Sequence, residues 1–354
     1  MDFNERHYGC RGRIISYKGL RMLTLENALI KTTIVLDKGT DIIEFSHKKS
    51  DTDFLWHAPW EIRNPYHYYP TSSRPEGGFL DCYFGGWNEV LPTAIAGSVL
   101  GASFGDMGEA VLLPWNYDIL EDQPELIRVR LSVELVRYPM KVEKIITIQS
   151  DSLVMKFDET VYNLSDLDLD FMWGQHPTFG APFLDNNCHL DLPECIMVTQ
   201  QYGEFTRLCA DEGQKWPFAK TLNGELVDLS EIQSQDARIE DMMYLTNLKE
   251  GWYGLTNQKK QVGFGMHWDL EIFPYLWYWQ CYCGPNPQPF FGRAYAVGVE
   301  PWTTPPIPIE QAVKAGLAAK IPGKGIINTQ FIAFAYEGVK RVAHIDEFGN
   351  VKGK

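Results

Sequence analysis

The feature that most constrains this chain is the alternation of apolar and polar residues at a spacing of two. The clearest case is residues 126–136, where every second side chain is apolar: Ile127, Val129, Leu131, Val133 and Leu135. Successive side chains of a strand point to opposite faces of a sheet, so this pattern predicts a strand with one buried face. Segments 140–149 and 153–163 follow after short polar turns, which predicts an antiparallel meander.

The same signal recurs along most of the chain. Further strands are predicted at 29–36, 40–46, 252–256, 262–268, 276–282, 294–300 and 329–337. Helical periodicity is scarce: residues 309–317 are predicted to form a short helix, and residues 230–238 give a weaker signal. Neither a low-complexity tract nor a Gly/Ser linker divides the chain. These patterns predict an all-β fold, a large antiparallel β-sandwich in which residues 1–354 form a single domain.

Composition excludes several classes of partner. The formal net charge of −14 disfavours nucleic acid and anionic membranes, because both would repel an acidic surface. We find neither a run of 18 apolar residues, as a membrane-spanning helix needs, nor an apolar secretory signal in residues 1–13. The seven cysteines are odd in number and lack zinc-site spacing, which predicts reduced thiols, a cytoplasmic location and no metal site.

Aromatic residues are abundant, with 11 Trp and 17 Tyr. Strands favour aromatic residues, but flat rings also bind the C–H faces of sugars, so this excess points weakly to a carbohydrate site. Two segments, 59–92 and 180–212, break the strand rhythm with Gly, Pro and aromatic residues. Long loops on a rigid β-scaffold commonly carry functional sites.

Two segments contain candidate acid–base residues. His176 lies in Trp-Gly-Gln-His-Pro-Thr-Phe-Gly, and we expect it near a strand end, where it can exchange a proton near neutral pH. Glu300 ends an apolar strand before a Pro-rich turn, and burial among Trp and Pro should raise its pKa, as suits a general base. A histidine bonded to backbone and a salt-bridged glutamate are the structural alternatives.

Two polar segments contain candidate binding residues. Gly85-Gly86-Trp87-Asn88-Glu89 combines glycines, which allow close backbone approach, with Asn88 and Glu89, which can bind hydroxyl groups. Residues 105–109 offer Asp106 and Glu109 before a Pro-Trp pair. Turn formation alone would also explain both segments.

Taken in order, these segments resemble the aldose 1-epimerase (galactose mutarotase-like) family. The resemblance spans roughly residues 25–340 and rests on five short motifs. They are the opening strands at 25–56, Gly85–Pro92, His176-Pro177-Thr178-Phe179, Phe273-Pro274-Tyr275-Leu276 to Trp279, and Val299-Glu300-Pro301-Trp302. The resemblance implies a large β-supersandwich, with His176 as the catalytic acid and Glu300 as the catalytic base.

The implied reaction is the interconversion of aldose anomers without metal or organic cofactor. Glu300 takes the proton of the C1 hydroxyl while His176 protonates the ring oxygen, and the roles reverse when the ring closes. This chemistry requires opposite protonation states near pH 7, for which we expect a protonated His176 beside an ionised Glu300. Arg74, Asp241 and Gln280 are expected among the sugar-binding residues.

One position departs from the family pattern. Many members have a second histidine in the segment that corresponds to residues 106–109, where this chain has Met107, which cannot hydrogen-bond a sugar usefully. The departure keeps two alternatives open: a non-catalytic carbohydrate-binding protein on the same fold, and another sugar epimerase, such as one acting on hexose phosphates. The expected partner is a small sugar, whose identity the sequence does not determine. Exposed aromatic residues would equally suit a homodimer interface.

Overall fold

The structure is a computed structural model that describes residues 2–68 and 77–354. Within these residues the larger sheet has twelve strands, in the order β1-β2-β3-β4-β6-β14-β24-β23-β20-β16-β17, with β5 paired to β4. Their bounds are β1 Arg11–Tyr17, β2 Leu20–Glu26, β3 Ile30–Val35, β4 Asp41–His47, β5 Thr52–Asp53, β6 Trp87–Val90, β14 Gly174–Gly180, β16 Ile196–Thr199, β17 Asp211–Lys215, β20 Ile239–Thr246, β23 Tyr275–Tyr282 and β24 Tyr295–Trp302.

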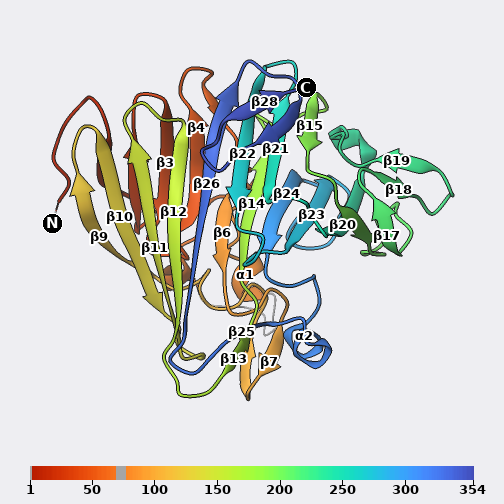
Figure 1. The fold of residues 1–354 in the computed structure, drawn as a ribbon, viewed down its shortest axis with the longest axis horizontal. Coiled ribbons are helices and arrows are strands. Elements are labelled where there is room, and N and C mark those ends of the chain that lie inside the picture. Colours follow the sequence, from red (N-terminus) through yellow and green to blue (C-terminus); the bar gives the residue numbers. More distant parts are fainter. Residues whose placement is uncertain (1, 69–76) are drawn as a thin grey trace.

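The second large sheet has eight strands over the same described residues, in the order β15-β21-β22-β26-β12-β11-β10-β9. Their bounds are β9 Asn116–Asp122, β10 Leu126–Glu134, β11 Met140–Gln149, β12 Val154–Asn163, β15 Cys188–Asp191, β21 Trp252–Asn257, β22 Val262–Trp268 and β26 Ile326–Glu337. Figure 1 shows this sheet stacked face to face on the first, with β10 to β12 in front of β3 and β4.

Short elements flank the two sheets. Four two-stranded sheets of the described residues pair β7 (Gly97–Val99) with β8 (Ala102–Phe104), β13 (Leu169–Phe171) with β25 (Ala319–Ile321), β18 (Phe218–Lys220) with β19 (Leu226–Asp228), and β27 (Val342–Ile345) with β28 (Val351–Gly353). The helical elements of the described residues are η1 (Pro65–His67), α1 (Gly77–Leu80), η2 (Gln235–Ala237) and α2 (Ile309–Ala315). None of these described helices has the length and apolarity needed to cross a membrane.

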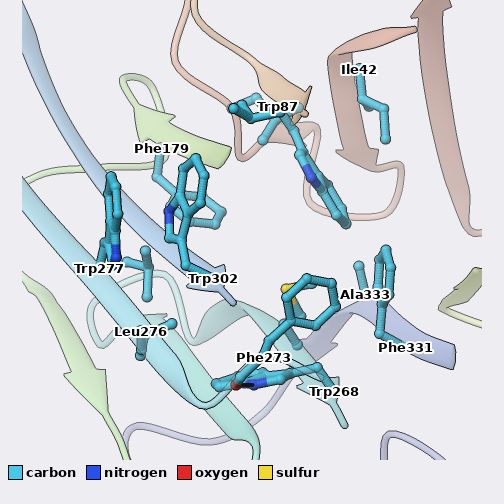
Figure 2. Close-up of a cluster of buried hydrophobic side chains, with 14 of the residues drawn as sticks. Ile42, Trp87, Phe179, Trp268, Phe273, Leu276, Trp277, Trp302, Phe331 and Ala333 are labelled. Atoms are coloured by element: carbon cyan, nitrogen blue, oxygen red, sulfur yellow. Dashed lines mark hydrogen bonds between the residues drawn. The ribbon is translucent and has the colours of Figure 1, made fainter. Parts of the chain in front are cut away.

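The predicted all-β sandwich and its central meander are confirmed. Strand β10 buries every second residue, as the alternation requires, and β10, β11 and β12 pair antiparallel in sequence. Aromatic side chains fill the space between the sheets: Trp87 packs on Phe157 with ring centroids 5.0 Å apart, and Phe179 lies 4.8 Å from Phe264. Figure 2 shows Trp87 pointing from its strand toward Phe331 of the other sheet.

Local details differ from the sequence expectations. His176 lies in the middle of the central strand β14, because Pro177 lies within the strand instead of ending it. Strand β24 continues two residues past Glu300, to Trp302. Residues 230–238 contain only the short η2 turn, whereas the helix predicted at 309–317 is present as α2, with Gly316 in the left-handed conformation after it. The seven cysteines are all free thiols.

Candidate active site

The candidate active site is built on a row of side chains that lie opposite one another on neighbouring strands. His176 of β14 pairs with Asn88 of β6, and the β14–β24 register places it opposite Glu300. Glu300 in turn pairs with Trp277 of β23. Cross-strand partners share a face of the sheet. Since the next residues along these strands pack against the second sheet, the row faces away from it.

Contacts at both ends hold the His176–Glu300 pair in place. His176 Nε2 lies 3.5 Å from Glu300 Oε1, slightly longer than a normal hydrogen bond, and His176 Nδ1 lies 3.2 Å from Asn88 Oδ1. Glu300 Oε2 accepts a hydrogen bond of 3.0 Å from Trp302 Nε1. Gly298 leaves the space for this carboxyl group, since a Cβ atom there would lie 2.2 Å from Glu300 Oε1. The pair therefore has a defined orientation.

Burial shifts the pKa values of both groups in the directions that disfavour charge. It raises the pKa of Glu300 to about 8, against the lowering effect of the Trp302 indole. It lowers the pKa of His176 to about 4, and the positive charge of Lys38 acts in the same direction. The raised pKa of Glu300 agrees with the sequence expectation. The expected ionised pair is wrong for this geometry: near pH 7 the two groups share one proton, held on Glu300, because desolvation costs both charges.

The pair lies in the wall of a cavity of about 700 Å³. Its described lining residues are Phe79, Leu80, Tyr83, Ala94, Ile95, Asp106, Met107, His176, Gln200, Tyr202, Gly203, Glu204, Phe205, Glu240, Met242, Trp277, Trp279, Pro285, Pro287, Gln288, Pro289, Phe290, Glu300 and Pro306. This lining is mainly apolar and aromatic, it includes four carboxyl groups, and it contains no Lys or Arg among the described residues. A mostly apolar cavity with a few convergent polar groups is typical of a small-molecule site.

Two tryptophans of β23, Trp277 and Trp279, form part of the cavity wall. Trp277 stacks on Trp302 with ring centroids 4.1 Å apart, and Figure 2 shows the two rings side by side. Trp279 donates a hydrogen bond of 3.0 Å to Glu240 Oε1, and burial raises the pKa of Glu240 to about 7. The described residues hold no group of three or more His, Cys, Asp or Glu side chains placed to bind a metal ion.

Besides the acid–base pair, two residues of the predicted binding segments line the cavity, and a third lies behind it. Asp106 and Met107 line it, and Met107 has the left-handed backbone angle φ of 61°. Asn88 lies behind His176 and contacts its ring nitrogen. Arg74 falls outside the described residues.

Two predicted binding residues on the central strands point away from the cavity. Glu89 faces the second sheet, where it accepts hydrogen bonds from Lys144 Nζ at 3.0 Å and Trp173 Nε1 at 2.5 Å. Gln280 faces the same way as Tyr278, and its amide donates to the Leu229 carbonyl at 3.1 Å. The predictions that Glu89 and Gln280 contact the sugar are therefore wrong. Side chains alternate between the two faces of a strand, so their neighbours Asn88 and Trp279 face the cavity side instead.

The remaining two predicted binding carboxylates have structural partners elsewhere. Asp241 is fully buried and accepts from Arg207 Nε at 2.7 Å and Thr206 Oγ1 at 2.9 Å. Glu109 accepts the backbone N–H groups of Val136 and Arg137 at 2.9 and 3.0 Å. Neither lines the cavity. Sequence reasoning instead missed Glu240, the neighbour of Asp241 on the opposite face of β20, which the alternation of that strand could have indicated.

No protein family model and no curated protein sequence matches this chain. Solved structures do match it. A candidate aldose 1-epimerase of Klebsiella pneumoniae superimposes with a TM-score of 0.73 at 15% identity, over 93% of this chain and 83% of that one. A galactose mutarotase-like protein of Clostridium acetobutylicum gives a TM-score of 0.64 at 13% identity, over 94% and 100% of the chains. The chain therefore has the galactose mutarotase-like fold, as a divergent example.

Proposed function

We propose that this protein is an aldose 1-epimerase-like enzyme that interconverts the anomers of a sugar, with His176 and Glu300 as its acid–base pair. The observation that carries the proposal is the placement of His176 Nε2 and Glu300 Oε1 3.5 Å apart in the wall of an aromatic-lined cavity. Anomer interconversion needs a proton donor and a proton acceptor within reach of the same hemiacetal. The likeness to solved structures supports the fold, and the placement of His176 beside Glu300 supports anomer interconversion.

The pair carries a single proton through both halves of this reaction. In ring opening Glu300 takes the proton from the C1 hydroxyl while His176 gives a proton to the ring oxygen. Opening starts from ionised Glu300 and protonated His176, and leaves Glu300 protonated and His176 neutral, which is the distribution that burial favours here. After rotation about C1–C2, Glu300 returns its proton to the aldehyde oxygen as His176 takes the ring hydroxyl proton. Both steps conserve one proton on the pair.

The cavity also bears on the substrate class. Phosphate recognition in proteins relies on Arg, Lys and backbone N–H groups, and the described lining contains four carboxyl groups without Lys or Arg. This composition favours a sugar without phosphate over a hexose phosphate. Carboxylates accept hydrogen bonds from hydroxyl groups, and the wall formed by Trp277 and Trp279 offers flat apolar surface to a sugar ring.

Polarimetry on freshly dissolved pure anomers of an aldose panel tests the proposal. We expect the protein to accelerate mutarotation of at least one unphosphorylated aldose, and Glu300→Gln to reduce that rate at least about 100-fold, as for loss of a general base. Glu143→Gln, a change on the outer face of β11, is the matched control. An unchanged rate in Glu300→Gln would refute the mechanism. Sugar binding without acceleration by the wild type would support the alternative of a binding protein, for which Met107 is the motivating residue.

A further inference from the structure

The row of the acid–base pair continues beyond Asn88 into the interior of the molecule. Ile42 of β4 pairs with Trp87 of β6 in antiparallel register, which places Asp41 directly opposite Asn88 on the same face. Asp41 also forms an ion pair with Lys38, and both side chains are at most 3% exposed. Charged side chains are seldom buried this completely unless they are paired, so this pair requires an explanation.

In this row a buried donor of Asn88 faces a buried acceptor of Asp41. The amide nitrogen Asn88 Nδ2 and the oxygen Asp41 Oδ1 are both buried without a hydrogen bond of normal geometry. Burial raises the pKa of Asp41, while Lys38 and then the Asn88 amide lower it, which places the Asn88 donor beside that carboxylate. An unpaired donor opposite an unpaired acceptor needs only a small movement to close. With Nδ2 directed to Asp41, Asn88 presents Oδ1 to the imidazole.

This orientation determines the tautomer of His176. Asn88 Oδ1 is an acceptor, so the ring nitrogen 3.2 Å away, Nδ1, carries the proton. Nε2 then directs its lone pair toward Glu300 Oε1. Phe79 and Tyr83 also pack against the ring, and the Tyr83 hydroxyl is occupied by Thr178. Among the described side chains, Asn88 is the hydrogen-bonding partner of Nδ1 and Glu300 is the polar group that faces Nε2.

We propose that Lys38, Asp41 and Asn88 form a buried positioning row that holds His176 with its proton on Nδ1 and its Nε2 lone pair toward Glu300 and the sugar. Lys38 compensates the charge of Asp41, Asp41 fixes the direction of the Asn88 amide, and Asn88 fixes the imidazole. These three are positioning residues, because the cavity lining includes none of them. The kinetic consequence rests on the proposed function, whereas the tautomer itself does not.

Nitrogen-15 NMR of the imidazole groups, with His176 assigned by comparison with His176→Asn, reads the tautomer directly in the full chain. We expect the Nδ1–H form in the wild type and a mixture of tautomers in Asn88→Ala. The double variant Lys38→Met/Asp41→Leu removes both buried charges together, which spares the fold the cost of a single unpaired charge, and it leaves the Asn88 amide without an acceptor. It should also give a mixture. Glu159→Gln, which changes a buried carboxyl group on β12 of the second sheet, is the control and should retain Nδ1–H.

Kinetics provide a second readout. By analogy with other orienting groups around catalytic histidines, we expect kcat of both row variants to fall about 10- to 100-fold with little change in KM. An Nε2–H tautomer in the wild type, or an unchanged Nδ1–H signal in folded Asn88→Ala, would overturn the positioning row. Absence of mutarotase activity in a wild type that shows Nδ1–H would instead refute the proposed function and leave the row intact.

Discussion

Strands β6 and β14 carry ionisable clusters on both faces, and the two clusters accommodate buried charge in opposite ways. On the inner face, Glu89 accepts hydrogen bonds from Lys144, Trp173 and Gln175. Its carboxyl group therefore has both a cationic partner and neutral donors. On the outer face, His176 and Glu300 have few partners and share one proton. The comparison shows that adjacent residues of one strand can serve stability on one side and proton transfer on the other.

The inner cluster contains one further carboxyl group, which makes its charge balance depend on Lys144. Glu159 accepts a hydrogen bond from Gln175 at 3.0 Å, and burial together with the charge of Glu89 raises its pKa well above the usual value. Lys144 is therefore the cation that pairs with Glu89 in a cluster of two buried carboxyl groups.

Removal of that cation should produce the largest effect. Lys144→Met leaves Glu89 buried without its ion pair, and we expect the free energy of unfolding to fall by about 3–5 kcal/mol. Urea denaturation followed by tryptophan fluorescence measures it. The rate per folded molecule should stay within about twofold of wild type. A stability loss below 1 kcal/mol would show that the inner cluster does not depend on its cation.

Neutralisation of the outer carboxyl group should act in the opposite direction. The pKa of Glu300 is about 8 in the folded chain against an ordinary value of 4.5, so its contribution to stability is fully present below pH 4.5 and is lost as pH rises through 8. Glu300→Gln removes this pH dependence. We therefore expect the unfolding free energy of the variant, relative to that of the wild type, to be roughly 1–3 kcal/mol higher at pH 9 than at pH 4. Denaturation at both pH values provides the test. A variant uniformly less stable than wild type would contradict the raised pKa.

The shared proton predicts a pH–rate profile. Since the pKa of His176 is about 4 and that of Glu300 about 8, the pair carries one proton between these values, and kcat/KM should be bell-shaped with flanks near them. Below the lower flank no base remains, and above the upper flank no acid remains, so the rate changes about tenfold per pH unit there. Polarimetry after subtraction of the uncatalysed rate measures the profile. A single flank between pH 6 and 7 would indicate a solvent-exposed histidine instead.

The smallest effect is expected at the position that departs from the family pattern. Met107 lines the cavity with a φ of 61°, a conformation that histidine adopts more readily than most residues. Met107→His adds a hydrogen-bond donor, worth about 0.5–1.5 kcal/mol, and should lower KM for an aldose about two- to tenfold. Met107→Leu is the control without a donor. Equal KM values in the two variants would show that this side chain does not reach the sugar.

The sequence was sufficient for the fold, and its motifs singled out His176 and Glu300, which the structure places 3.5 Å apart. Their acid–base role stays a prediction. Alternation over long strands such as β10 and β11 predicted a sandwich, and short motifs marked His176 and Glu300. The wider site was less accessible. Glu89, Asp241 and Gln280 are polar residues one position from a cavity-facing neighbour, and the face toward which a strand turns depends on its register with partners distant in sequence. That register turns Glu240 and Trp279 toward the cavity.

The different roles of the two faces of β6 and β14 limit which insertions and deletions these strands can tolerate. Deletion or insertion of one codon within β6 or β14 would exchange the faces, sending His176 into the interior and Gln175 into the cavity, so that a single slip would abolish chemistry and folding together. Changes of two residues preserve the faces and alter only the strand ends. Length variation among natural relatives should therefore be confined in these two strands to even steps, whereas the surrounding loops can vary by any number.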